Sequence, residues 1–121
     1  MSYKKLDVYT IALSLFYEVH PFTLKLPSYE LYELGSQLRR SSDSVVTNIV
    51  EGYGRRSYKN DYIRFLIYAH SSVDETLNHL EKISYLYPSF KEQGEQLYNE
   101  YNSLGAKLNN YIKYVRKNWK T

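Results

Sequence analysis

Residues 97–115, LYNEYNSLGAKLNNYIKYV, carry the repeat that decides the fold. Their large apolar side chains recur at alternating intervals of four and three residues: Leu97, Tyr101, Leu104, Leu108, Tyr111 and Val115. These intervals put the apolar side chains on one face of an α-helix, which can then pack against other helices. Ser89 and Glu92, just after Pro88, have the spacing of a capping box, so we expect the helix to begin there.

The segment before Pro88 has the same periodicity and predicts a second long helix. Its apolar and small residues again alternate at intervals of four and three: Tyr62, Leu66, Ala69, Val73, Thr76, Leu80, Ile83 and Tyr87. Ser57 is the predicted N-cap, because a serine side chain can accept a hydrogen bond from the first backbone amides of a helix. We expect the helix to end before Pro88, since a residue that precedes proline disfavours helical geometry.

The first half of the chain predicts two further helices. One is expected to follow Ser28 and to present apolar and small residues on one face: Leu34, Leu38, Val45, Ile49 and Gly52. The other contains Leu6 to Phe16, and Pro21 is expected to kink or end it near residues 17–20. Strand patterns are missing. Four helices with short connections predict an all-α fold, an antiparallel up-down-up-down four-helix bundle.

Length and composition limit the class of protein. A chain of 121 residues is expected to form one domain, residues 1–121. The absence of cysteine excludes disulfides, zinc ribbons and thiol catalysis. The N-terminal segment lacks a signal-peptide cleavage pattern, and no run of 18 apolar residues could span a membrane. We therefore expect a cytoplasmic protein with no membrane partner.

Two stretches in the middle of the chain resemble a known family. They read SQLRRSSDSVVTNIVEGYGRRS, residues 36–57, and DYIRFLIYAHSSVDE, residues 61–75. They are similar to motifs of the four-helix bundle protein family, also called the 23S rRNA intervening-sequence proteins. The matching positions are Gln37, Arg40, Ser44, Asn48, Ile49, Glu51, Gly52, Phe65, Leu66, Ala69, Ser72 and Glu75.

The resemblance covers about residues 3–87 and implies a four-helix bundle that assembles as a homopentamer. It implies no established biochemical activity. Accessory proteins of diversity-generating retroelements resemble the same bundle and work beside a reverse transcriptase by binding nucleic acid. This chain departs from the family pattern at Asp43, Val50, His70 and Ser71. Asp43 adds a carboxylate to a patch of small residues and is expected to alter any interface there.

The glycines of the family motif, in Gly52-Tyr53-Gly54, do not predict a nucleotide-binding loop. A dinucleotide fingerprint needs a third glycine where this chain has Ser57, and a P-loop needs a Gly-Lys-Ser/Thr sequence that is missing. Gly52 is instead expected to allow close helix packing. Gly54 is expected to end the helix, with Arg55 and Arg56 near the negative end of its dipole.

Ser44, Asn48 and Glu51 are expected on one helical face, toward the helix that carries Ser72. Small residues on both helices would let the two backbones approach closely. We interpret Asn48 and Glu51 as a buried polar network that fixes the register of the two helices. A direct functional role for this pair is the alternative that stays open.

Catalytic and metal-binding patterns are weak, so we predict no catalytic residue, no metal and no cofactor. A di-iron bundle needs Glu-x-x-His elements, whereas Glu75 and His79 are four residues apart. We interpret them as a surface hydrogen-bonded pair. No serine is accompanied by a histidine and an acidic residue in a catalytic pattern. The chain is therefore predicted not to be an enzyme, and a metal-dependent enzyme is the weakest alternative.

Charge is distributed unevenly over the predicted bundle. One end gathers cations, and we call it the basic end: Lys4, Lys5, Arg55, Arg56, Lys59, Lys113, Arg116, Lys117 and Lys120. Its nearby acids are Asp7, Glu51 and Asp61. The other end combines five acids with three lysines: Glu30, Glu33, Glu81, Glu92 and Glu95 with Lys25, Lys82 and Lys91. Net charge is only +3, so the distribution matters more than the total.

Two functional interpretations follow. In the first, a non-enzymatic homo-oligomer binds RNA or DNA phosphates with its basic end, as an accessory to another macromolecule. Tyrosines number 15, and those among the cations, with Trp119, could stack on unpaired bases: Tyr3, Tyr53, Tyr58 and Tyr114. In the second, outward residues such as Ile11, Leu15, Tyr32 and Ile67 make protein contacts without nucleic acid. A solvated basic end with no ligand is the plain alternative.

Overall fold

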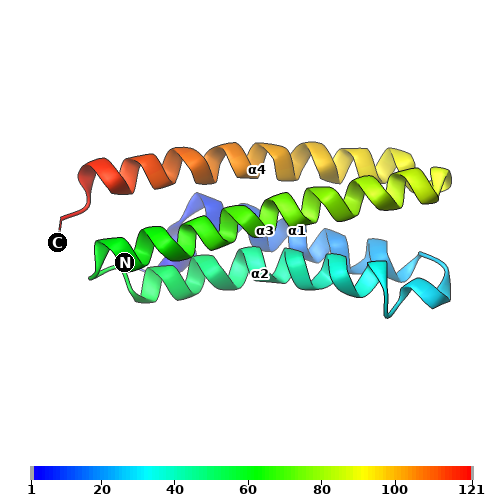
Figure 1. Ribbon diagram of the computed structural model, residues 1–121, viewed down its shortest axis with the longest axis horizontal. Coiled ribbons are helices and arrows are strands. Elements are labelled where there is room, and N and C mark those ends of the chain that lie inside the picture. Colours follow the sequence, from blue (N-terminus) through cyan, green and yellow to red (C-terminus); the bar gives the residue numbers. More distant parts are fainter. Residues whose placement is uncertain (1, 121) are drawn as a thin grey trace.

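The computed structural model describes residues 2–120, which form four long helices and three short 3₁₀ helices. The long helices are α1 (Asp7–Leu24), α2 (Leu34–Gly54), α3 (Lys59–Leu86) and α4 (Lys91–Asn118). The short ones are η1 (Tyr3–Lys5), η2 (Ser28–Glu30) and η3 (Pro88–Phe90). No strand occurs among these residues. The predicted all-α fold with four helices is confirmed, and Figure 1 shows consecutive helices running in opposite directions.

The core lies along the faces that the apolar periodicity predicts. On α4 the buried side chains are Leu97, Tyr101, Leu104, Leu108, Ile112 and Val115. This set differs from the prediction at one position, where Ile112 is buried and Tyr111 lies at the edge of the core. Each fully buried leucine contributes about 1.5–3 kcal/mol relative to an exposed one. The helices therefore form because their apolar faces meet one another.

Pro21 does not end α1, so that part of the prediction is wrong. The helix continues to Leu24, and Pro21 itself is exposed. Phe22 and Thr23, which follow it, are almost completely buried. The Thr23 hydroxyl donates a hydrogen bond to the His20 carbonyl (2.8 Å) and accepts one from Arg39 Nη1 (2.9 Å). Burial of this last turn outweighs the single backbone hydrogen bond that a proline removes.

Three predicted helix starts are wrong. Helix α2 begins at Leu34 because the residues from Ser28 form η2 instead. Helix α3 begins at Lys59, and no side chain caps it, so Ser57 is not its N-cap. Ser89 belongs to η3, and no capping box forms at the start of α4. Where a helix begins depends on how the preceding connection packs against the core. The local sequence does not specify that packing.

Small residues bring α2 and α3 close together, as predicted. A Cβ atom at Gly52 would lie 2.9 Å from Phe65 Cβ, so only glycine fits there. The Ser72 hydroxyl donates to Ser44 Oγ (2.9 Å), and the Thr76 hydroxyl donates to Ser41 Oγ (2.8 Å). No glycine among the described residues has a positive φ. Gly54 is therefore the last helical residue of α2 rather than a left-handed cap.

Within residues 2–120, each helix is too short or too polar to cross a bilayer.

Candidate nucleic-acid interface

The basic end is assembled from four parts of the chain. Figure 1 shows both chain termini at the end of the molecule where α2 finishes and α3 begins. That arrangement gathers η1, the α2–α3 connection, the first turn of α3 and the last turns of α4. These segments carry every predicted nucleic-acid-binding residue: Lys4, Lys5, Arg55, Arg56, Lys59, Lys113, Arg116 and Lys117. The side chains divide into those with partners inside the molecule and those without.

Arg55 is largely compensated by neighbouring acids. Its Nε atom lies 3.5 Å from Glu51 Oε2, and its Nη1 atom lies 3.9 Å from Asp61 Oδ2. Its guanidinium also lies 4.9 Å from the centre of the Phe65 ring. Both ion pairs are at the surface, where such pairs contribute at most about 1 kcal/mol. The charge of Arg55 is therefore less available to a ligand than its exposure suggests.

Arg56 closes the end of α2. Its Nη1 atom donates to the Tyr53 carbonyl (2.9 Å), and its guanidinium lies over the Tyr53 ring, 4.1 Å from the centre. Its own carbonyl accepts a hydrogen bond from Trp119 Nε1 (2.8 Å). Arg56 therefore joins the C-terminal residues to the α2–α3 connection.

Lys59 joins α3 to the end of α4. Its Nζ atom donates to the Arg116 carbonyl (2.5 Å). The last carbonyls of a helix lack intrahelical donors and carry a partial negative charge, so a lysine there is stabilising. Lys59 is thus a structural bridge at the basic end.

Five of the predicted residues remain exposed and have no ion pair within residues 2–120: Lys4, Lys5, Lys113, Arg116 and Lys117. We call them the open cations. Three of them lie on the last two turns of α4, and the other two lie on η1. Cations that face solvent without an anionic partner are the groups best placed to contact phosphate.

The aromatic residues at this end divide in the same way. Tyr53 is buried, and Trp119 packs against Tyr62 with the ring centres 5.3 Å apart. Tyr3 contacts Tyr9 edge to face. Tyr58 and Tyr114 are 70% and 53% exposed, so only these two of the predicted stacking residues present a largely open ring.

Buried Tyr62 and partly buried Tyr111 join α3 to α4 near the basic end. The hydroxyls of Tyr62 and Tyr111 are 2.8 Å apart, and the Tyr111 ring stacks on Tyr114 at 6.0 Å. Burial raises the pKa of Tyr62 well above its ordinary value, and the hydrogen bond to Tyr111 adds to this. Burial also raises the pKa of Tyr111. Both hydroxyls therefore stay protonated and hold α3 to α4.

Asn48 and Glu51, two residues of the family motif on α2, have different structural roles. Asn48 Nδ2 donates to the Ser44 carbonyl (2.9 Å) and to Ser44 Oγ (3.0 Å), while Ser44 Oγ accepts from Ser72. Asn48 thus supports the contact between α2 and α3 from within its own helix. Glu51 does not join this network. It is exposed and pairs with Arg55, so its predicted burial is wrong.

The remaining motif residues lie away from the basic end. Gln37 and Arg40 are both exposed on α2, whereas neighbouring Arg39 donates to the Leu31 carbonyl (2.6 Å). His79 Nε2 lies 3.4 Å from Glu75 Oε2. His79 is only 6% exposed, so the predicted surface pair is wrong for the histidine. Within residues 2–120, no three His, Cys, Asp or Glu side chains are grouped to hold a metal.

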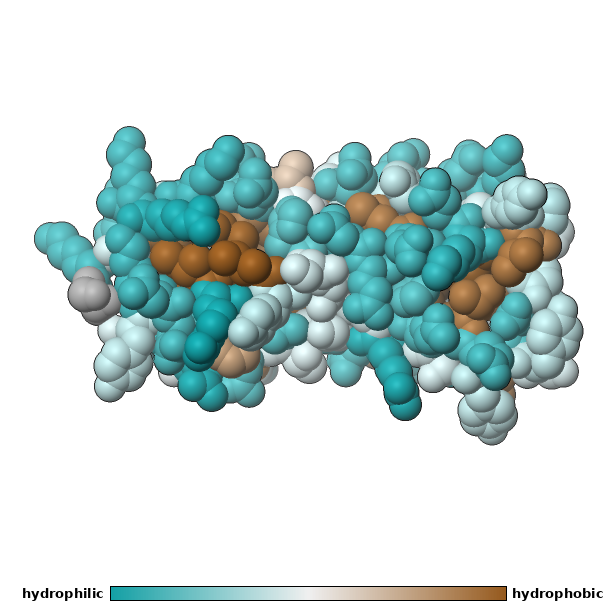
Figure 2. Space-filling model, viewed as in Figure 1, coloured by the Kyte–Doolittle hydropathy of each residue, from teal (hydrophilic) through white to brown (hydrophobic). Residues whose placement is uncertain are grey.

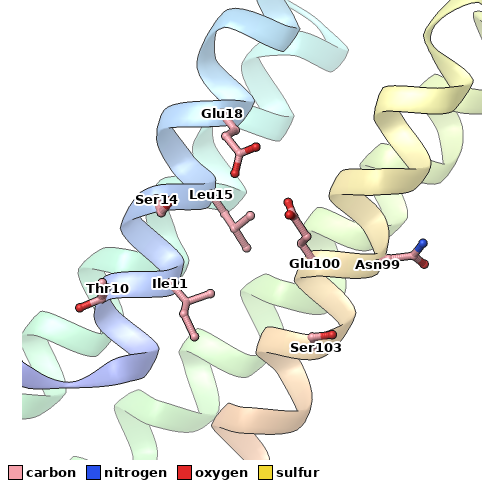
Figure 3. A pocket seen from close by; sticks show the side chains of 8 residues that line it. All are labelled: Thr10, Ile11, Ser14, Leu15, Glu18, Asn99, Glu100 and Ser103. Atoms are coloured by element: carbon pink, nitrogen blue, oxygen red, sulfur yellow. The ribbon is translucent and has the colours of Figure 1, made fainter.

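Sequence reasoning missed a groove between α1 and α4, with a volume of about 500 Å³. Figure 3 shows Ile11 and Leu15 pointing between the helices, while Glu18 and Glu100 direct their carboxylates toward each other. Leu15 is 3% exposed and forms the floor, so its predicted outward position is wrong. Burial raises the pKa of Glu100, and the charge of Glu18 raises it further. No sequence signal links two residues on the first and last helices.

Comparison with known proteins identifies the family. A family model described as 23S rRNA-intervening sequence protein matches residues 4–110. The curated proteins contain no match. The matched range includes α1, α2, α3 and most of α4, so it covers the helices that build the bundle. The chain therefore belongs to the 23S rRNA-intervening sequence protein family.

Proposed function

We propose that the protein is a non-enzymatic helical bundle whose basic end contacts RNA or DNA through phosphates. The observation that carries this proposal is the group of open cations, which share one end of the molecule and have no ion pair within residues 2–120. Cations of this kind release counterions when they meet phosphates, and that release drives binding without regard to base sequence. The proposed role needs no metal and no cofactor.

RNA is the more strongly supported nucleic acid. The family description names an intervening sequence of 23S rRNA. Tyr58 and Tyr114 add two exposed rings among the cations, and such rings stack on unpaired bases. The proposed ligand is therefore a single-stranded region of RNA, held by phosphate contacts and stacked bases.

Self-association belongs to the same proposal. The family resemblance implies a homopentamer, and a ring of copies would repeat the open cations around one axis. Repetition would strengthen the positive field and let several weak contacts act together. We propose that this assembly acts in the cytoplasm as an accessory to another macromolecule.

The salt dependence of RNA binding tests the proposal. The test variant combines Lys113→Gln, Arg116→Gln and Lys117→Gln, and fluorescence anisotropy of a short labelled single-stranded RNA is measured over a range of salt concentrations. Log affinity should fall linearly with log salt, and the variant should reduce that slope by about two, since each phosphate contact on a single strand contributes about 0.7. A duplex RNA of the same length should bind more weakly if the exposed rings stack on bases.

The matched control removes the same charge from the other end through Lys25→Gln, Lys82→Gln and Lys91→Gln. It should leave the slope unchanged, because those lysines lie away from the basic end. Equal losses in both variants would show that net charge alone matters. Absence of binding at low salt would overturn the proposal.

A protein-interaction scaffold without nucleic acid is the second candidate. It is favoured by Tyr32, which is 82% exposed, and by Ile67, which is 39% exposed on the outer face of α3. Protein purified at low salt distinguishes the two candidates. A nucleic-acid-free sample in stable complex with another protein would support the scaffold.

A further inference from the structure

The end of the bundle opposite the basic end exposes large apolar side chains. We call it the tyrosine end, and it presents Leu24, Tyr29, Tyr32, Tyr85 and Leu86. Their exposed fractions run from 55% to 82%. In Figure 2 brown and pale residues lie at this end, on the right of the view, and a separate brown group lies nearer the opposite end. A group of large apolar side chains in water is typical of a protein interaction surface.

The tyrosine end has a rigid support. The Tyr87 hydroxyl donates to Glu30 Oε2 (2.5 Å) and is hydrogen-bonded to the Tyr29 hydroxyl (3.0 Å). The other oxygen of Glu30 accepts from the Leu34 amide (3.5 Å), and the Glu30 side chain is buried. These contacts fix η2 against the end of α3. The exposed rings therefore lie on a preformed surface, which reduces the entropy lost when a partner binds.

Two hollows continue this surface along α3. One, of about 480 Å³, is lined by Asn78, Glu81, Lys82, Tyr85 and Leu86. The other, of about 390 Å³, is lined by Glu81, Ser84, Glu95, Tyr98 and Asn99. Glu81 lines both hollows, and we call the two together the Glu81 groove. The first hollow places the exposed Tyr85 and Leu86 beside the Glu81 carboxylate.

Charge at the tyrosine end indicates the kind of partner. Glu81 is exposed, lines both hollows and has no ion pair within residues 2–120. Glu95 already lies 3.9 Å from Lys91, and Lys82 lines one of the hollows, so Glu81 is the carboxylate best placed to meet a ligand. A phosphate would be repelled by this carboxylate, whereas arginine or lysine would be attracted to it. We propose that the Glu81 groove docks a protein segment that combines leucine-like side chains with arginine or lysine. Apolar anchors would cover Tyr85 and Leu86 while the cation would meet Glu81.

This inference goes beyond the proposed nucleic-acid contact because it concerns the other end of the molecule. Helix α4 contains 28 residues, which corresponds to a separation of about 42 Å between the ends. A bundle with these two surfaces would hold a nucleic acid and a protein apart at a fixed distance.

Synthetic peptides test the Glu81 groove. The probe is a labelled amphipathic helical peptide with leucine on one face and arginine beside it, and fluorescence anisotropy reports its binding to the full chain. One comparison peptide replaces each arginine with glutamate, and another replaces each leucine with glutamine. Only the first peptide should bind well. Tyr85→Ser combined with Leu86→Ser should weaken its binding by about tenfold or more.

A matched control is available on the same helix. Ile67→Ser combined with Tyr68→Ser removes another adjacent pair of exposed apolar residues from α3 and should leave peptide binding unchanged. Glu81→Gln combined with Glu95→Gln should weaken binding and reduce its salt dependence. All these side chains face solvent, so the variants should keep the fold.

Several results would overturn the inference. Equal weakening by both serine pairs would mean nonspecific adhesion. Loss of binding in Glu18→Gln combined with Glu100→Gln would place the peptide in the groove between α1 and α4. A fall in oligomeric mass on changing Tyr85 and Leu86 would identify a second copy as the occupant. RNA binding should persist in the Tyr85 and Leu86 variant, so this inference can fail while the proposed function stands.

Discussion

Each end of the bundle, the basic end and the tyrosine end, is held together by a hydrogen bond from an aromatic side chain, but the two ends expose different side chains. At the basic end, Trp119 donates a hydrogen bond to the Arg56 carbonyl and fastens the C-terminal residues to the α2–α3 connection. At the tyrosine end, Tyr87 donates to Glu30 and fastens η2 to α3. Outside these supports, one end exposes cations together with Tyr58 and Tyr114, and the other exposes tyrosine and leucine without such a group of open cations. The same helices therefore present two surfaces that suit different classes of partner.

This difference follows from the order of the helices. Because consecutive helices run in opposite directions, alternate connections lie at the same end. Residues from segments that are far apart in the chain can then lie at the same end and give it a common charge or hydrophobicity.

Equivalent glycine substitutions should have unequal effects near the two ends. Gly52→Ala near the basic end would place Cβ 2.9 Å from Phe65 Cβ, an atom that cannot move without moving α3. Overpacking of this kind costs about 1–3 kcal/mol, against a gain of up to about 1 kcal/mol for alanine over glycine in a helix. Gly94→Ala near the tyrosine end comes too close only to the Ser84 hydroxyl, which can rotate away. Denaturant unfolding should show a clear loss for Gly52→Ala alone.

Gly54→Ala is the control for the glycine pair. A Cβ atom added at Gly54 would meet no neighbouring atom within 4 Å, and the backbone there is helical. The substitution should leave stability unchanged or slightly higher. A large loss in this variant would mean that glycine is needed at this connection for a reason other than packing.

The hydrogen bonds of Trp119 and Tyr87 should each stabilise only the end of the bundle in which they lie. Trp119→Phe removes the bond to Arg56 and should cost about 1 kcal/mol, the usual contribution of such a bond. Tyr87→Phe removes a donor from the buried Glu30 and should loosen η2. Hydrogen exchange should rise at the α2–α3 connection in the first variant and at η2 in the second. A rise at both ends in either variant would contradict independent ends.

The smallest expected effect concerns Glu100, which lies between the two ends. Burial and the charge of Glu18 raise its pKa above the ordinary value of 4.5. The folded chain therefore binds this proton more tightly than the unfolded chain, and the resulting stability is lost as pH rises through the raised pKa. Glu100→Gln should remove this fall in the free energy of unfolding with rising pH. The variant should therefore be modestly more stable than wild type at neutral pH. Thermal unfolding across pH measures the difference, and parallel curves for the two proteins would contradict it.

The helices could be predicted from the sequence because apolar periodicity is local. Leu97 to Val115 repeat at helical intervals, and the structure buries most of that face. Pro21, Ser57 and Ser89 led to wrong boundaries because a helix end depends on tertiary contacts. Burial of Phe22 and Thr23 carries α1 past Pro21. No local pattern reports that burial.

The candidate site was only partly predictable for a similar reason. Helix order alone predicts which cations share an end. It does not reveal that Arg55 is paired with Glu51 and Asp61 or that Lys59 bonds to the Arg116 carbonyl. The sequence also does not show whether a given tyrosine lies in the core or at the surface. Only the structure separates buried Tyr62 and Tyr101 from exposed Tyr85.

The common location of the chain termini has a practical consequence. Helix η1 and the residues that follow α4 both lie at the end of the molecule that carries the open cations. Any affinity tag or fused domain, attached at either terminus, would emerge beside the surface proposed to bind RNA. A circular permutant that joins the termini and opens the chain between α1 and η2 would move that attachment to the tyrosine end. Such a permutant would leave the basic surface unobstructed.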